Sequence, residues 1–130
     1  MMVEVEIRGK NFPLCLTVAA LDKVNEKCGG LKNLSNFMKG DGDSGKSICN
    51  TVWMLGLLIQ EGEENRLVEA RFSGEKAERR AVPDSSAIMH LLTPGAAQAY
   101  RLAVWNAVNE SMHQGIEAEY SKNAENAEQA

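Results

Sequence analysis

The sequence predicts an α+β protein that is mainly α-helical, in which an N-terminal β-hairpin is followed by about five or six helices, the last one longest. Apolar residues alternate with polar ones at the N-terminus, and farther along the chain they recur at intervals of three and four. With 130 residues, 44% of them hydrophobic and 25% charged, the chain has the balance of one domain. We expect one globular domain over residues 1–120 and a disordered tail over residues 121–130, which lacks an apolar anchor.

The N-terminal alternation predicts the two strands of the hairpin. Its apolar members lie on both sides of Gly9-Lys10, and they are Val3, Val5, Ile7, Phe12, Leu14 and Leu16. Gly9-Lys10 fits a two-residue type II′ turn, and a turn centred there pairs Val5 with Leu14. Every apolar side chain then lies on one face. Pro13 has no N–H to donate, which places its strand at an edge.

Helical periodicity begins after the hairpin. A first helix is expected from Val18, capped by Thr17 and stopped by Gly29-Gly30. A second, shorter helix with a narrow apolar stripe is expected over residues 31–38. The segment from residue 48 to residue 60 is apolar around most of its circumference, so it is expected to be a central helix covered on several sides.

The second half of the chain is also expected to be helical. Residues 63–72 fit two or three further turns, and residues 73–82 form a solvated, mobile connection. Pro83-Asp84 begins a short helix, and Thr93-Pro94 supplies a cap followed by proline at the first position of the last and longest helix. The expected apolar face of that helix holds Leu102, Trp105, Val108 or Asn109, Met112 and Ile116.

Charge and composition exclude several classes of protein. The formal net charge is −4, from 14 Lys and Arg against 18 Asp and Glu, which argues against nucleic acid as a main partner. The longest apolar run, Val52 to Ile59, is too short to cross a bilayer, and no secretion signal is visible. The three cysteines are irregularly spaced, so we expect free thiols in a reducing cytoplasm, with Cys28 and Cys49 buried in helical apolar stripes.

The loop from Gly40 to Ser47 matches the phosphate-binding pattern G-x-x-x-x-G-K-[ST]. The residues before it lack the buried β-branched run of a parallel strand, and Asp41 and Asp43 would repel phosphates. We therefore expect a flexible loop in which Ser44 or Ser47 caps the central helix. A small nucleotide-binding regulator that uses this loop is kept as the alternative function.

Other motifs that carry chemistry are incomplete. A calcium loop starting at Asp41 would place Lys46 where glycine is required and Val52 where a bidentate glutamate is required. The cysteines and histidines show no zinc-type pairing, and no Gly-x-Ser-x-Gly elbow is present. We expect no enzyme activity, no cofactor and no metal.

The chain is rich in large apolar residues, among them six methionines. They can fill the core, or part of them can form a groove for a partner helix, for which adaptable Met and Leu surfaces are suited. The candidate partner contacts are Phe37 and Met38 on the second helix and Met112 and Ile116 on the last. Ordinary core packing remains equally open at each of them.

Several segments resemble the tail assembly chaperones of long-tailed bacteriophages and prophages. Val5-Glu-Ile-Arg-Gly-Lys-Asn-Phe-Pro-Leu14 resembles the N-terminal hairpin of that family, and Leu16 to Gly30 is similar to its first helix. Thr51 to Gln60 resembles its leucine-rich central segment, and Leu92 to Asn109 its last helix. The glycine-rich loop from Gly40 and the basic connection from Arg71 to Arg80 depart from the family pattern.

The resemblance implies a function without catalytic residues. A tail assembly chaperone binds the long tape-measure protein, helps tail-tube subunits polymerise around it, and leaves before the virion is mature. Tail-tube subunits and a second copy of the chain are further candidate partners. The implied location is the cytoplasm of the bacterial host.

Overall fold

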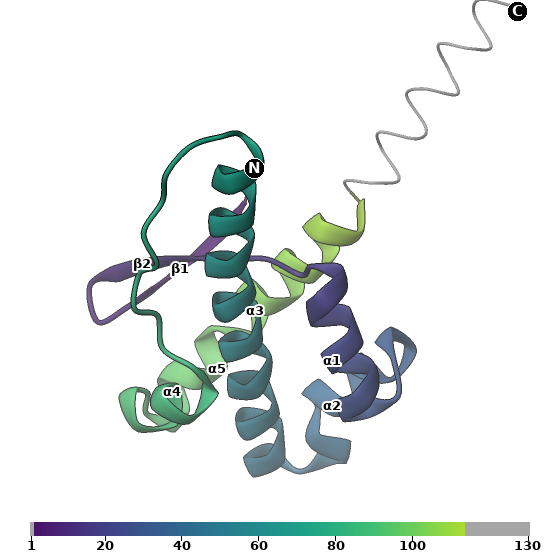
Figure 1. The fold of residues 1–130 in the computed structure, drawn as a ribbon. Coiled ribbons are helices and arrows are strands. Elements are labelled where there is room, and N and C mark those ends of the chain that lie inside the picture. Colours follow the sequence, from purple (N-terminus) through teal and green to yellow (C-terminus); the bar gives the residue numbers. More distant parts are fainter. Residues whose placement is uncertain (1, 114–130) are drawn as a thin grey trace, which may run out of the picture.

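The computed structural model describes residues 2–113, and over this range the protein is α+β and mostly helical, as predicted (Figure 1). A two-stranded antiparallel hairpin comes first, and helices follow it. A helical run over residues 101–113 follows the last of the bounded elements. The bounded elements are β1 (Val3–Ile7), β2 (Lys10–Leu14), α1 (Val18–Cys28), η1 (Leu31–Asn33), α2 (Leu34–Met38), η2 (Gly40–Gly42), α3 (Ser44–Phe72), α4 (Ser85–Leu91) and α5 (Pro94–Ala99).

Helix α3 is the centre of the fold. Figure 1 shows it upright between α1 and α2 on one side and α4 and α5 on the other, and β2 packs against it as well. Its buried face includes Met54, Leu55, Leu58 and Ile59. Other elements add to the same core Leu14, Val24, Leu34, Ile88 and Val104. No helix within residues 2–113 is long and apolar enough to span a membrane.

The hairpin is present, but the predicted turn and register are wrong. Arg8 and Gly9 form the turn with φ values of 54° and 81°, which is the positive-φ pair of a type I′ turn, and Val5 pairs with Phe12. Hydrogen-bonded and non-hydrogen-bonded pairs alternate from the turn. The predicted register would put Pro13 at a hydrogen-bonded position, whereas the observed one puts it opposite Glu4 at a position where its missing N–H is not needed. The pairing shifts by two residues, so the apolar face is unchanged.

The predicted limits of α1 are confirmed. The Thr17 hydroxyl oxygen accepts a hydrogen bond from the Ala20 N–H at 3.0 Å, and Gly29 ends the helix with a φ of 88°. The expected apolar residue Val18 lies outside the core, because Ala20 and Val24 form the buried side of the helix.

The predicted central helix and the turns after it form one helix of 29 residues, α3. Among the described residues α3, and not the last helix, is therefore the longest. Gly62 does not interrupt it, because Gly62 packs directly against the carbonyl oxygen of Pro13. The cap also differs from the prediction. Asp43 accepts from the Lys46 N–H at 2.9 Å, whereas the Ser47 hydroxyl is buried and donates elsewhere.

The last helical segment is broken at Tyr100, whose hydroxyl donates a hydrogen bond to the Glu6 carbonyl of β1. Its buried face is offset from the predicted one: Leu102 is 69% exposed, and the buried residues are Ala97, Val104, Ala107 and Val108. Val104 and Val108 are four residues apart and share the buried face, whereas Leu102 lies two residues before Val104 and therefore on another side of the helix. Ile116 and the expected tail over residues 121–130 lie outside the described residues.

Candidate functional site

The sequence-predicted contact residues are not brought together by the fold. Phe37 is half-buried, and its ring meets the Trp53 ring edge-on with centroids 5.7 Å apart. Met38 is 1% exposed, so its side chain belongs to the α2–α3 packing. Met112 is 42% exposed and follows Ser111, whose hydroxyl accepts a hydrogen bond from the Leu16 N–H just before α1. Ile116 is not among the described residues.

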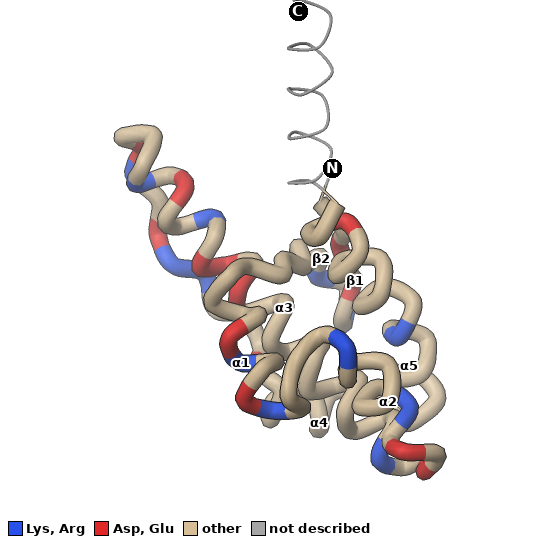
Figure 2. Tube along the Cα trace, turned by 90° about the vertical axis from the view of Figure 1, so that its right-hand side faces the viewer, with Lys and Arg blue, Asp and Glu red and all other residues tan. Residues whose placement is uncertain are grey.

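Two exposed apolar side chains at the end of α3 were not among the contacts predicted from the sequence. Phe72 is 93% exposed, and Val68 lies one turn before it on the same side of α3. Figure 2 shows this end of α3 projecting from the body of the molecule, with acidic and basic residues along it. In the sequence, Val68 and Phe72 are apolar residues four apart within a charged segment, and this pattern could have indicated them as partner contacts. Leu102 and Met112 add exposed apolar surface on the last helix.

In the loop that matches the phosphate-binding pattern, two backbone N–H groups and one hydroxyl are already engaged. The N–H groups of Lys46 and Ser47 donate to the side chain and the carbonyl of Asp43, both at 2.9 Å. The Ser47 hydroxyl donates to the Met38 carbonyl at 2.6 Å. A phosphate loop offers free amides and a hydroxyl for magnesium. Here a carboxylate stands at the helix start instead, and within residues 2–113 no strand leads into the loop.

The cysteines do not form a reactive or metal-binding cluster in the described part of the chain. No group of three or more His, Cys, Asp and Glu side chains within residues 2–113 could hold a metal ion. Burial raises the pKa of the Cys15 thiol, and the charges of Glu61 and Glu69 add to this, so the thiolate is disfavoured. Cys28 is half-buried, but the expectation for Cys49 is wrong, because it lies on the exposed side of α3.

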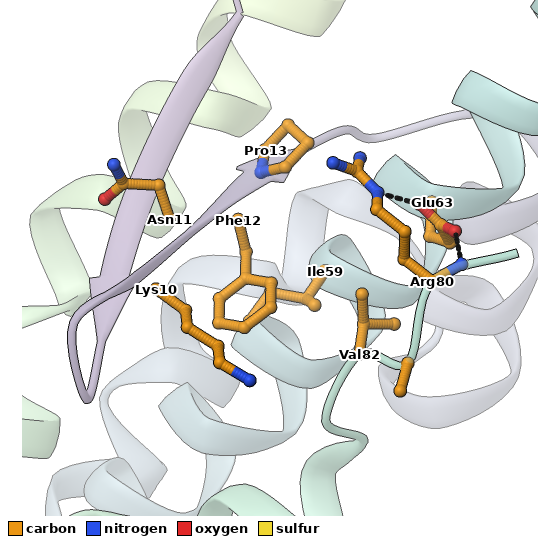
Figure 3. Close-up of a pocket in the computed structure, with 9 residues that line it drawn as sticks. Lys10, Asn11, Phe12, Pro13, Ile59, Glu63, Arg80 and Val82 are labelled. Carbon is orange, nitrogen blue, oxygen red and sulfur yellow. Dashed lines mark hydrogen bonds and ion pairs between the residues drawn. The ribbon is translucent and has the colours of Figure 1, made fainter.

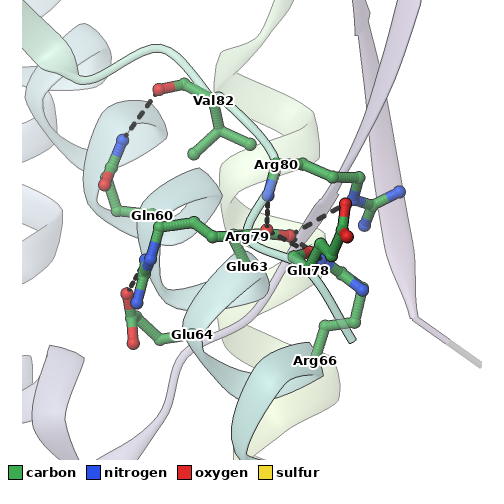
Figure 4. Close-up of polar contacts among 8 residues, drawn as sticks. All are labelled: Gln60, Glu63, Glu64, Arg66, Glu78, Arg79, Arg80 and Val82. Carbon is green, nitrogen blue, oxygen red and sulfur yellow. Dashed lines mark hydrogen bonds and ion pairs between the residues drawn. The ribbon is translucent and has the colours of Figure 1, made fainter. Parts of the chain in front are cut away.

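The connection after α3 is fixed to that helix by a buried carboxylate. Residues 75–84, which we call the strap, have no regular structure and run back along α3 (Figure 1). Glu63 of α3, with a side chain 2% exposed, accepts two hydrogen bonds from Arg66, at 2.9 and 2.8 Å, and a further one from the Arg80 backbone at 2.5 Å (Figure 4). The Arg80 Nε lies 3.3 Å from the same carboxylate. The exposed position predicted for residues 73–82 is confirmed for residues 73–81, whereas Val82 is half-buried; the mobility of this segment stays a prediction.

These contacts lower the pKa of Glu63 to about 2. The hydrogen bonds from Arg66 are the largest cause, desolvation opposes them, and the Arg80 N–H adds to them. Neighbouring contacts hold the strap at three more points, and in one of them Arg66 donates to the Glu78 carbonyl at 2.6 Å. Arg79 pairs with Glu64, and the Gln60 amide donates to the Val82 carbonyl at 3.2 Å (Figure 4). A carboxylate so fully occupied by fixed donors serves structure rather than proton transfer.

A cavity of about 370 Å³ lies between β2, α3 and the strap (Figure 3). Apolar side chains form part of its wall, with Phe12 from β2, Ile59 from α3 and Val82 from the strap. Lys10 and Arg80 line it as well. No pattern in the sequence indicates this cavity, because its walls come from three segments far apart in the chain.

Comparisons of the chain with protein-family models, with curated proteins and with solved structures gave no match. The function is therefore argued from the residues and contacts described above.

Proposed function

We propose that this chain is a tail assembly chaperone of a long-tailed bacteriophage or prophage, which binds the tape-measure protein and assists tail-tube assembly without catalysing a reaction. In this proposal it acts in the cytoplasm of the bacterial host and does not remain in the mature virion. Tail-tube subunits and a second copy of the chain are further contacts. The order of a hairpin, a capped first helix and an apolar central helix supports the family resemblance.

The observation that carries the proposal is the exposed apolar surface on two helices. Phe72 and Val68 lie at the projecting end of α3, and Leu102 and Met112 lie on the last helix. A long helical protein with apolar stripes aggregates unless those stripes are covered. An acidic protein that offers apolar helix surface can cover them and keep the complex dispersed.

The test is coexpression with the long helical protein encoded beside this chain. We expect a higher soluble yield of that protein and copurification of the two. The complex should persist at 1 M salt, a condition of about 3 Å Debye length in which charge contacts are screened but apolar contacts are not. Failure to copurify at every salt concentration, with both proteins folded, would count against the chaperone.

A pair of variants tests the contact surface. Met112→Asp should weaken copurification with little change in the melting temperature, because the side chain is exposed on the surface and does not belong to the core. Met89→Asp is the matched control, since Met89 is similarly exposed, at 46% against 42%, but belongs to α4. Phe37→Ser should lower the melting temperature, because it removes the edge-on contact with Trp53. If Met89→Asp reduced binding and Met112→Asp did not, the last helix would not be the contact.

A further inference from the structure

The cavity between β2 and the strap continues into a second one. The second cavity, of about 230 Å³, shares Lys10, Phe12 and Ala81 with the first and extends to Arg8 and Leu91. Because the two cavities share these three residues, we treat them as one groove, which we call the hairpin groove, and Figure 3 shows its first part beside β2. A groove with apolar walls and a few polar groups at its rim is the usual form of a binding site.

The charge of the hairpin groove is opposite to that of the whole chain. Three cations line it, Arg8, Lys10 and Arg80, against the single carboxylate of Glu63. That carboxylate is shared by Arg66, by the Arg80 backbone and by the Arg80 guanidinium, so one negative charge faces two arginines. Lys10 is exposed and has no ion-pair partner within residues 2–113. A chain with a net charge of −4 thus keeps a basic rim at an apolar groove, which is complementary to an acidic and apolar ligand.

The backbone of β2 favours an extended ligand. Asn11 lines the groove and pairs with Glu6 at a non-hydrogen-bonded position, so its N–H and C=O point away from β1. Pro13, the other β2 residue of this kind, has no N–H, and its carbonyl is covered by Gly62. An extended segment beside β2 can therefore form backbone hydrogen bonds at Asn11 and place alternate side chains into the groove.

We propose that the hairpin groove binds an extended peptide segment in which carboxylate and apolar side chains alternate. The apolar side chains contact Phe12 and Val82, and the carboxylates lie beside Lys10 and Arg80. This inference rests on the proposed function for the identity of the partner, in that the segment would belong to the tape-measure protein. The groove itself is argued from its own residues.

The first test uses a labelled five-residue peptide of alternating glutamate and leucine, followed by fluorescence anisotropy. It should bind at least about tenfold more tightly than a lysine–leucine peptide or a glutamate–serine peptide, a difference of about 1.4 kcal/mol. Equal binding of the glutamate–leucine and lysine–leucine peptides would overturn the proposal, because the basic rim would then have no role.

Two variants locate the site. Lys10→Glu should reduce the affinity for the glutamate–leucine peptide at least about tenfold, and Lys32→Glu, which reverses an exposed charge on η1, should not. Ala81→Trp should block the groove, because Ala81 lines both cavities, and its exposed position should leave the melting temperature unchanged. Full binding by Lys10→Glu and Ala81→Trp would overturn the proposal.

The same variants separate this inference from the proposed function. Ala81→Trp should weaken the affinity for the tape-measure protein at least about fivefold, since one of several contacts is lost. If that affinity stays unchanged, the chaperone proposal stands and the groove inference fails. If the peptide binds as described but the tape-measure protein does not bind, the groove stands and the chaperone proposal fails.

Discussion

Gly62 of α3 lies so close to Pro13 of β2 that a Cβ atom at residue 62 would be 2.3 Å from the Pro13 carbonyl oxygen. The residues on either side of Gly62 connect α3 to two other segments. Glu61 accepts a hydrogen bond from the Thr17 hydroxyl at 2.8 Å, and Glu63 holds the strap. One turn of α3 thus fixes the hairpin, the start of α1 and the strap.

Gly62→Ala should destabilise the protein by about 2 kcal/mol, because the added methyl group forces β2 away from α3. In solvent-exposed helices, by contrast, a glycine-to-alanine change raises the free energy of unfolding by up to about 1 kcal/mol. Gly95→Ala in α5 is the control, since no heavy atom lies within 4 Å of a Cβ there. Urea unfolding of the two variants measures the difference. A Gly62→Ala variant as stable as the original would show that β2 is not held at this point.

Acid should weaken the attachment of the strap to α3. The folded pKa of Glu63 is lowered from 4.5 to about 2, so its stabilisation is complete above pH 4.5 and is lost as the pH falls toward 2. The shift corresponds to at most about 3 kcal/mol, and we expect about 1–2 kcal/mol because solvent screens the Arg80 pair. The Glu63→Gln variant should therefore have a lower free energy of unfolding at pH 7 than the original protein. Between pH 4.5 and pH 2 its free energy of unfolding should fall less than that of the original protein. Equal slopes of unfolding free energy against pH in the two proteins would contradict this.

The core position Leu55 should not tolerate a charge. Its side chain is fully buried on α3, so Leu55→Asp places an unpaired carboxylate in the core. The cost of several kcal/mol is a large part of a typical total stability of about 5–15 kcal/mol, and we expect loss of the cooperative melting transition. Cys49→Asp is the control, since Cys49 is on the exposed side of the same helix. A soluble Leu55→Asp protein that melts cooperatively would show that α3 is not central.

The glycine-rich loop should not bind nucleotides. Lys46→Ala should leave the melting temperature and copurification unchanged, because Lys46 is exposed and its N–H is what bonds to Asp43. Calorimetric titration with magnesium ATP or GTP should give no saturable heat with either protein. Saturable binding that is lost in Lys46→Ala would restore the nucleotide-binding regulator as the function.

Local patterns in the sequence determined much of the fold, because strand alternation, helix periodicity and helix capping depend on residues that are close together in the chain. Alternation predicted the hairpin strands, Thr17 and Gly29 predicted the limits of α1, and the apolar residues of α3 predicted its central place. The candidate site was less accessible to such reasoning. Met38 belongs to the apolar stripe of its helix, but such a stripe is the same for residues that pack in the core, as Met38 does, and for residues that contact a partner.

The tertiary structure decided what depends on contacts between distant segments. The turn lies at Arg8-Gly9 because that register leaves Pro13 without a hydrogen bond to make, and α3 continues through Gly62 because β2 packs there. The hairpin groove exists because Glu63 holds Arg80 and the strap across from Lys10. Spacing along the chain fixes which residues can share a face of a helix or strand, but only the packing of those elements fixes which faces meet and which remain open.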